Sequence, residues 1–358
     1  MKNSYRISAL LGLVLLISTA TSAVAAKKYD GQTMQVWVGI SFRAAEQVRE
    51  VIAPKLKDKY GIELAVEATG STAMLEKISV MKENPRITIC GWDVPIGARA
   101  AEMGLCETID LQKIPNAKTM YDWCVVRIGG HVKVLTASVI ANGILYNADE
   151  FQKRGFPAPT SWNDFWRKEY SGRVSIVAPQ STMGLSSLVS IARMEGGGEN
   201  NIDPGFKKLK TLLPNIHTIH TWSSEMMKLM QLGEVWIGIQ SDNIATALRA
   251  AGFPAKWAAP KEGAPVVAGG VSIIANAPYQ DVAYDYLNLY YSEEFQFRRM
   301  RESGSSSAIK AVWERFPQKD KESMSMTDKD FDKLIQLDWS KIEKGRAAWT
   351  ERWQKEMK

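Results

Sequence analysis

The chain has 358 residues, of which 45% are hydrophobic, so it can bury a large core, and two lobes suit this length better than one. Its net charge is only +6, because 45 Lys and Arg residues are interleaved with 39 Asp and Glu residues. This balance, without a basic block of five or more residues, argues against a nucleic-acid-binding protein, and we expect no nucleic-acid partner.

The N-terminus carries the pattern of a signal peptide. Lys2 and Arg6 precede the short apolar run ISALLGLVLLISTA, and small residues follow it, with cleavage expected after Ala25 or Ala26. An uncleaved membrane anchor is the alternative, but the apolar run is shorter than the roughly 20 residues that a membrane span requires. We therefore assign residues 1–26 to a signal peptide and expect an exported mature chain.

The chain has three cysteines, Cys90, Cys106 and Cys124, all in its first half. In an oxidising compartment two of them could pair, with Cys106 and Cys124 as the preferred choice, but the fold cannot depend on a disulfide framework. Their spacing does not match a zinc site, and the chain has only three histidines. We therefore expect no metal site and no cofactor.

Short apolar strands alternate with helices in the first part of the mature chain. Strands are predicted at residues 34–39, 62–68 and 86–93, and helices at 44–61, 71–84 and 97–104. The first helix places Val48, Val51, Ile52 and Leu56 on one face, and Gly61 is typical of a helix end.

The pattern changes between Val125 and Tyr146, where apolar runs follow one another without helices, as in a crossover into a second lobe. The alternation then resumes, with strands at 173–179, 215–222 and 234–240 and helices at 160–170, 181–197, 203–213, 223–233 and 241–252. Residues 255–278 hold two strand-like runs broken by Gly and Pro, which suits a return to the first lobe. A helical pair at 279–303 and a charged C-terminal helix complete the chain.

This alternation predicts an α/β fold with mostly parallel sheets flanked by helices. We assign residues 27–135 and 264–303 to the first lobe. Residues 136–263 and 304–358 are assigned to the second lobe, and a ligand cleft is expected between the two.

Hydroxyl-bearing residues recur where predicted strands give way to helices. In parallel sheets these junctions share the carboxyl edge, and free N–H groups at helix N-termini favour anions there. The hydroxyl candidates for ligand binding are Ser41, Ser71, Thr72, Ser181, Thr182 and Ser223. The alternative is that each serves only as an N-cap of its own helix.

Aromatic and acidic residues flank the same junctions. Trp37, Trp92 and Trp222 each offer an apolar wall with one N–H donor, while Asp93 and Asp242 could pair with an amine. The alternatives are core packing for each tryptophan and, for Asp242, capping of the helix that follows.

The chain resembles the periplasmic solute-binding proteins of ABC importers, in the branch that includes spermidine and putrescine binders. The resemblance spans the mature chain and is carried by VWVGISFRAAEQVREVIAPKLKDKYGIEL, GSTAMLEKI, SWNDFWRKEYSGRVSI, LGEVWIGIQSD and most specifically WAAPKEGAPVVAGGVSIIANAP. It implies the two-lobed type II binding-protein fold, closure of the lobes over a small ligand, and delivery to an ABC permease in the inner membrane. We expect a monomer with no enzymatic activity.

Departures from the polyamine binders concern the ligand. The resemblance implies an aspartate where this chain has Gly269 beside Gly270, a tryptophan where it has Ser241, and acidic residues where it has Gln180 and Ser181. Of these positions, Ser181, Ser241, Gly269 and Gly270 remain candidate ligand contacts, but two ammonium groups would lack opposing carboxylates. We therefore expect a small organic anion or zwitterion, with Asp93 or Glu225 available for one amine.

Other functions stay open. Polyamine binding is the first alternative, and a periplasmic sensor subunit that presents its ligand to a membrane receptor is the second. An exported enzyme is a third class, but no set of Ser, His and Asp or close pair of carboxylates is indicated. The paired tyrosines of related iron binders are not matched either, since Tyr290 and Tyr291 lie in a different predicted helix.

The C-terminal helix carries an apolar stripe at three-and-four spacing on a charged background. Its members are Ile335, Trp339, Ile342, Trp349 and Trp353. We expect the stripe to pack on its own lobe, and a docking surface for the permease or a sensor is the alternative.

Overall fold

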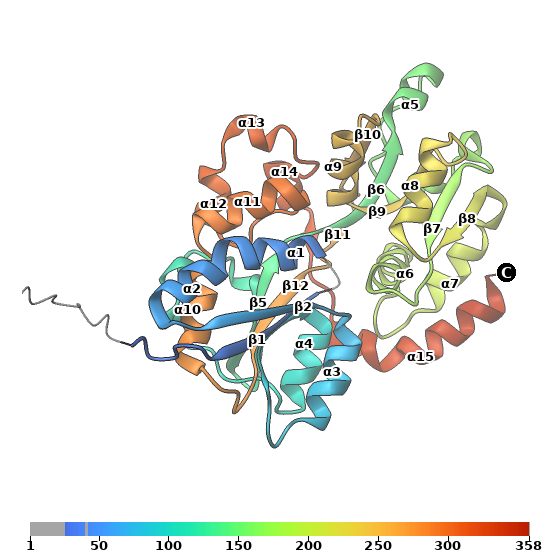
Figure 1. Cartoon of the computed structure of the whole chain (residues 1–358). Helices are drawn as coiled ribbons and strands as arrows, with labels where there is room; N and C mark the ends of the chain where they lie inside the picture. Colours follow the sequence, from blue (N-terminus) through green and yellow to red (C-terminus); the bar gives the residue numbers. More distant parts are fainter. Residues whose placement is uncertain (1–25, 40–41, 358) are drawn as a thin grey trace, which may run out of the picture.

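The computed structural model describes residues 26–39 and 42–357, which form two α/β lobes around two sheets (Figure 1). The first sheet has the order β2-β1-β3-β12-β5-β4, with β1 (Thr33–Val38), β2 (Glu63–Ala68), β3 (Ile87–Asp93), β4 (Val125–Ile128), β5 (His131–Ser138) and β12 (Gly269–Ile273). The second has the order β10-β6-β9-β7-β8, with β6 (Asn142–Asn147), β7 (Val174–Val177), β8 (Ile216–His220), β9 (Ile237–Ser241) and β10 (Ala255–Ala258). The two-lobed α/β prediction is confirmed.

Helices flank both sheets. Those of the first lobe and the segment after it are α1 (Phe42–Gln47), α2 (Ala53–Tyr60), α3 (Ser71–Val80), α4 (Val94–Glu102), α10 (Gln280–Tyr290), α11 (Glu293–Ser303), α12 (Lys310–Arg315), α13 (Gln318–Lys321) and α14 (Asp328–Phe331). Those of the second lobe are α5 (Ala148–Arg154), α6 (Thr182–Met194), α7 (Asp203–Lys210), α8 (Ser223–Gln231), α9 (Asp242–Ala250) and α15 (Trp339–Glu356). Among the residues that the structure describes, we find no helix long and apolar enough to cross a membrane.

The prediction of mostly parallel sheets needs a correction. Strand β1 is parallel to β2 and β3, and β7 is parallel to β8 and β9, as expected for strands joined through helices. The other pairs in the two sheets are antiparallel, because the crossover strands follow one another directly or return from the other lobe. Both sheets are therefore mixed.

Three segments cross between the lobes. The first links β5 to β6, and the second links β10 to β12, so both predicted crossovers are confirmed. They lie side by side, since the Val267 N–H donates to the Ile140 carbonyl at 2.8 Å. A third crossing, which the sequence did not predict, runs through β13 (Leu334–Ile335), paired with β11 (Ala264–Pro265), and leads to α15.

The predicted boundary between residues 303 and 304 is wrong for the segment that follows it. Ile309, Val312 and Trp313 lie in the core of the first lobe, because this segment packs against the helices that cover the first sheet. Only after β13 does the chain join the second core, through Ile342 and Trp353. The prediction that the C-terminal stripe packs on its own lobe is thus confirmed.

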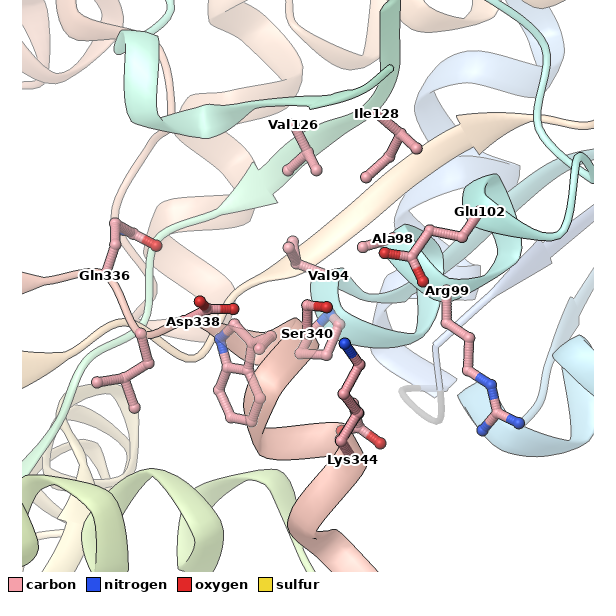
Figure 2. Close-up of a pocket in the computed structure, with 14 residues that line it drawn as sticks. Val94, Ala98, Arg99, Glu102, Val126, Ile128, Gln336, Asp338, Ser340 and Lys344 are labelled. Carbon is pink, nitrogen blue, oxygen red and sulfur yellow. The ribbon is translucent and has the colours of Figure 1, made fainter. Parts of the chain in front are cut away.

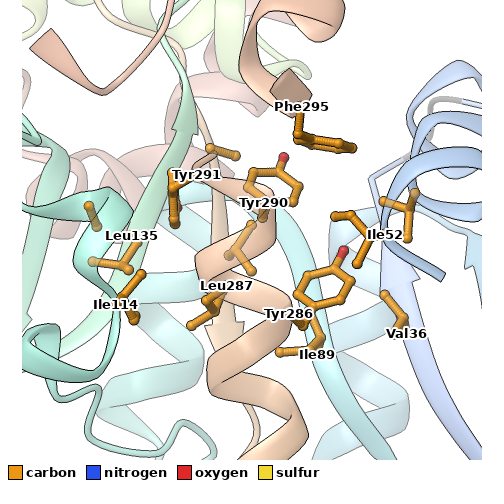
Figure 3. Packing of buried hydrophobic residues seen from close by; sticks show 14 of the residues in the cluster. Val36, Ile52, Ile89, Ile114, Leu135, Tyr286, Leu287, Tyr290, Tyr291 and Phe295 are labelled. Carbon is orange, nitrogen blue, oxygen red and sulfur yellow. The ribbon is translucent and has the colours of Figure 1, made fainter. Parts of the chain in front are cut away.

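The core of the first lobe lies between the sheet and α10. Figure 3 shows Tyr286 of this helix beside Ile52 and Ile89, while Leu287 lies toward Ile114 in the same cluster. The neighbouring Tyr291 is fully buried and donates its hydroxyl to the Thr136 carbonyl at 3.1 Å. The tyrosine pair is therefore structural, which agrees with the expectation that it does not hold iron.

Two predicted helices differ locally from the expectation. The helix predicted at 44–61 contains one π-helical turn, Val48–Ile52, just before Pro54, whose ring lacks the N–H that a regular helix needs, and it ends at Gly61 with a φ of 75° as predicted. The helix predicted at 160–170 is wrong. It forms two short 3₁₀ turns, Trp162–Trp166 and Lys168–Tyr170, because Arg167 between them is extended.

The preferred cysteine pairing is also wrong. All three thiols are free and buried, and Cys106 and Cys124 lie in different hydrophobic clusters. Burial raises the pKa of the Cys106 thiol to about 12, so it is unreactive in the folded chain.

Candidate ligand-binding cleft

A cavity of about 780 Å³ lies between the two lobes. The first lobe contributes Thr72, Leu75, Asp93, Ile96 and Arg99, and the second contributes Gln180, Ser181, Thr182, Met183, Thr221, Trp222, Ser223, Ser241, Asn243 and Ile244. The crossing segments add Ile140, Val267 and Ala268, and α15 adds Glu343 and Arg346. The size suits a small organic molecule.

Five helices begin at this cavity: α3 and α4 from the first lobe, and α6, α8 and α9 from the second. Ser181 caps α6, since its Oγ accepts the N–H of Gly184 at 3.0 Å. The Ser223 and Ser241 hydroxyls lie at the starts of α8 and α9 and donate to Gln240 and Asn243, respectively. The convergence of strand-to-helix junctions on one cavity is thus present, and it brings hydroxyls and helix N-termini together.

Asp93 connects the two lobes. Its backbone N–H donates to Ser71 Oγ at 3.0 Å within the first lobe, and its carboxylate faces the Thr182 hydroxyl of the second lobe at 3.5 Å. Asp93 keeps exposed surface, yet both lobes surround its carboxyl group, and this desolvation raises its pKa above the ordinary value against the opposing effects of Thr182 and Arg346. It is the one sequence-predicted carboxylate on the cavity wall.

Seven of the predicted residues line the cavity: Thr72, Asp93, Ser181, Thr182, Trp222, Ser223 and Ser241. Trp222 is the most exposed of the predicted tryptophans, because 64% of its surface is accessible and little of its side chain packs against the rest of the protein. Ser41 lies outside the described residues, and Ser71 contributes through its contact with Asp93 rather than as a lining residue.

Five predicted residues are structural instead. Trp37 and Trp92 are buried in the first lobe, where the indole N–H of Trp92 donates to Ser272 at 3.2 Å. Gly269 and Gly270 lie within β12, and a Cβ at Gly270 would meet the Val134 side chain, so this glycine permits close packing.

Asp242 is the fifth of these residues. It is fully buried, and its carboxylate accepts the N–H of Ala141 at 2.8 Å, so it ties α9 to the first crossing rather than capping α9. Glu225 is likewise occupied, since it accepts the backbone N–H groups of Thr221 and Trp222.

Three charged residues of the cavity were not predicted: Arg99, Glu343 and Arg346. Arg99 lies on α4, six residues after Asp93, while the other two lie on α15. Their helical spacing gave no signal, because charges on an amphipathic helix are usually solvated. The one sequence feature that bears on Glu343 and Arg346 is the apolar stripe of the C-terminal helix, because it determines which side of α15 packs against the protein.

A second cavity of about 510 Å³ lies on the other side of α4, between β4 and the start of α15. Figure 2 shows Val126 and Ile128 from β4 above it and Lys344 from α15 below it. Arg99 and Glu343 border both cavities. The ligand candidates predicted from the sequence belong to the first cavity, not to this one.

Comparisons with known proteins agree with this architecture. A family model for bacterial extracellular solute-binding proteins matches residues 51–323. A spermidine/putrescine-binding periplasmic protein of Escherichia coli is 29% identical over 36% of this chain and 37% of its own length.

Solved structures extend the similarity to the whole fold. An ABC transporter protein from Clostridium perfringens has a TM-score of 0.76 at 21% identity and covers 91% of this chain and 100% of its own. The periplasmic binding protein AfuA from Actinobacillus pleuropneumoniae, solved with fructose-6-phosphate, has a TM-score of 0.70 at 21% identity over 91% of this chain and 99% of its own. Because the family model covers most of the chain, this protein belongs to the bacterial extracellular solute-binding family, whose members bind solutes and are not enzymes.

Proposed function

We propose that this chain is the periplasmic substrate-binding component of an ABC importer, which captures a small organic anion or zwitterion between its lobes and delivers it to inner-membrane permease subunits. Family membership supports solute binding, and the fold shared with the Clostridium perfringens ABC transporter protein supports the transport role. We expect it to act as a monomer.

The observation that carries the ligand class is the convergence of five helix N-termini on one cavity. Free N–H groups and the positive ends of helix dipoles stabilise carboxylate or phosphate groups without a cation. Arg99 adds a positive charge on the first-lobe wall. The bound sugar phosphate of AfuA shows that a protein of this fold accepts a phosphorylated solute.

The zwitterionic option rests on Asp93. Its carboxylate lies in the same cavity as Arg99, so one wall presents a negative and a positive group. An ammonium group beside Asp93 would offset the desolvation that now raises the pKa of this carboxyl. The exposed Trp222 on the opposite lobe offers an apolar face for the carbon skeleton between the charged ends.

Polyamine binding is the second candidate, and the relationship to the Escherichia coli spermidine/putrescine-binding protein favours it. Two carboxylates, Asp93 and Glu343, line the cavity, but Glu343 already pairs with Arg346. A diamine would then have one available carboxylate for two ammonium groups, which is an unfavourable balance in a partly desolvated site.

A thermal-shift screen of the chain from residue 27 onward tests the proposal. The compounds are amino acids, polyamines, phosphonates, sugar phosphates and aromatic acids. Binding to the folded state raises the melting temperature, by an amount that grows with ligand concentration relative to Kd. We expect shifts from anions or zwitterions, and a shift from spermidine or putrescine alone would contradict the proposed ligand class.

A further inference from the structure

Helix α15 is fixed to the second lobe along its length, although it lies beyond the residues that the family model matches. Ile342 and Trp353 are buried in the second core, and Trp353 packs edge-on against Phe206 of α7. Arg352 pairs with Asp203, and Lys210 pairs with Glu356 at 2.8 Å. In Figure 1, α15 (red) runs from the neighbourhood of α4 along the second lobe.

The first half of α15 delivers a charged pair to the ligand cavity. Arg346 and Glu343 form a two-point contact, with Nε to Oε2 at 2.9 Å and Nη2 to Oε1 at 2.6 Å. Arg346 also donates from Nη1 to the Gln180 carbonyl at 3.3 Å, in the loop before α6. The guanidinium is therefore held from two directions at the cavity wall.

This pair is not explained by the stability of the helix. Pairs three residues apart on a partly exposed helix surface contribute little to folding, and α15 is already anchored by its core residues. The three contacts use three of the five guanidinium N–H donors, which leaves two, as far as the described residues go, for a partner in the cavity. Across the cavity lies Arg99 of the first lobe.

We propose that Arg346 is a ligand-contacting residue that selects for an anionic group, and that Glu343 balances its charge while keeping the guanidinium in place. This inference rests on the proposed function and assigns the anionic end of the solute to the wall formed by α15. Its consequence is a pair of opposite effects. Removing Arg346 weakens binding of an anion, whereas neutralising Glu343 strengthens it, since the ligand then no longer meets a neighbouring carboxylate.

The variants are chosen to separate charge from shape. Glu343→Gln keeps an oxygen that can accept a guanidinium N–H but removes the negative charge. Arg346→Gln removes the positive charge, and Arg346→Lys keeps the charge but loses the two-point geometry, so it also serves if Arg346→Gln fails to fold. Lys344→Gln is the matched control, because Lys344 is an exposed cation on the same helix that borders only the second cavity.

The probes share a short amine chain and differ in the second head group: β-alanine carries a carboxylate, O-phosphoethanolamine a phosphate and putrescine a second ammonium. They are tested beside the best compound of the solute screen, and affinities are measured by isothermal titration calorimetry. For the anion-bearing compound that binds, we expect Arg346→Gln to weaken binding about 10- to 100-fold and Arg346→Lys by less. Glu343→Gln should tighten it about 2- to 5-fold, and Lys344→Gln should leave it within about 2-fold.

Each outcome decides the matter. Opposite shifts in Arg346→Gln and Glu343→Gln support the inference. If both variants bind the solute as tightly as the wild-type chain, or if both bind it more weakly, the inference is overturned. The proposed function stays intact in either case, because the wild-type chain still binds the solute. Binding of putrescine alone overturns the anion-selective role. If no compound of the screen binds the wild-type chain, the proposed function fails and the inference fails with it.

Discussion

The strand-to-helix junctions of the two lobes present different kinds of side chain to the ligand cavity. In the second lobe the strand ends themselves face the cavity, and Ser181, Thr182 and Ser223 present neutral hydroxyls. In the first lobe the tryptophans at the strand ends turn into the core, and the charged residues Asp93 and Arg99 of the junction and helix α4 line the wall instead. The strand ends of the second lobe therefore offer neutral donors, whereas the junction and helix α4 of the first lobe offer charge. The charged pair that the second lobe contributes, Glu343 and Arg346, comes from α15 instead.

This difference shows that a strand-to-helix junction in the sequence predicts where the cavity lies. Whether a side chain at that junction is exposed to the cavity depends on how it packs against the core of its lobe. Trp92 is 1% exposed because Gly97 and Ser272 accommodate its ring in the first lobe. Trp222 occupies an equivalent junction in the second lobe and is 64% exposed. Two tryptophans at strand-to-helix junctions thus differ in exposure, and the following predictions test whether they also differ in role.

The largest expected effect comes from the buried member of that pair. Trp92→Ala should lower the free energy of unfolding by about 3–5 kcal/mol, because it leaves a large cavity and removes the indole N–H that donates to the Ser272 hydroxyl. Urea denaturation followed by circular dichroism measures this. A loss below about 1 kcal/mol would mean that Trp92 is not a core residue.

The next effect comes from Asp242, which ties α9 to the first crossing between the lobes. Burial raises the pKa of this carboxyl to about 7, against the opposing backbone hydrogen bonds, and its Oδ2 has no partner among the described residues. Because the pKa in the folded state lies above the value of about 3.9 in the unfolded chain, this group's contribution to stability is complete below about pH 4. It is lost as the pH rises through 7.

Asp242→Asn removes this titration while keeping an oxygen for the Ala141 N–H. We expect the wild-type chain to lose up to about 4 kcal/mol of stability between pH 4 and pH 8 relative to the variant. Urea denaturation of both proteins across this pH range gives the difference. Parallel pH profiles would contradict the assignment of a buried titrating carboxyl beside the first crossing.

The exposed tryptophan should affect binding more than folding. Trp222→Ala is expected to change the free energy of unfolding by less than about 1 kcal/mol. It should weaken binding of the solute identified by the screen about 5- to 10-fold, since the aromatic surface on which the solute can stack in the second lobe is lost. Calorimetric titration checks the affinity, and unchanged binding would remove Trp222 from the site.

The smallest expected effect concerns the cysteines. Since all three thiols are free and buried, a reducing agent should leave the melting temperature unchanged. Thiol titration should detect few reactive groups in the native chain and three after unfolding. Fewer than three in the unfolded, unreduced chain would reveal a disulfide.

The sequence predicted the features that depend on local pattern. The alternation of strands and helices, the two first crossings and the hydroxyls of the second-lobe junctions all follow from residues close together in the chain. It could not predict the third crossing or the place of Ile309 and Trp313 in the first core, since these depend on contacts between distant segments. Arg346 was missed for the same reason, as a charged residue on a helix surface looks solvated until the lobe beside it is known.

Hydrogen–deuterium exchange of the wild-type chain, with and without the best solute from the screen, tests the central claim most directly. The account predicts that the solute slows exchange in both lobes at once, at the starts of α3, α4, α6, α8 and α9 and at residues 343–346 of α15. Slowed exchange confined to one lobe, or to β4 and the second cavity, would contradict binding between the lobes.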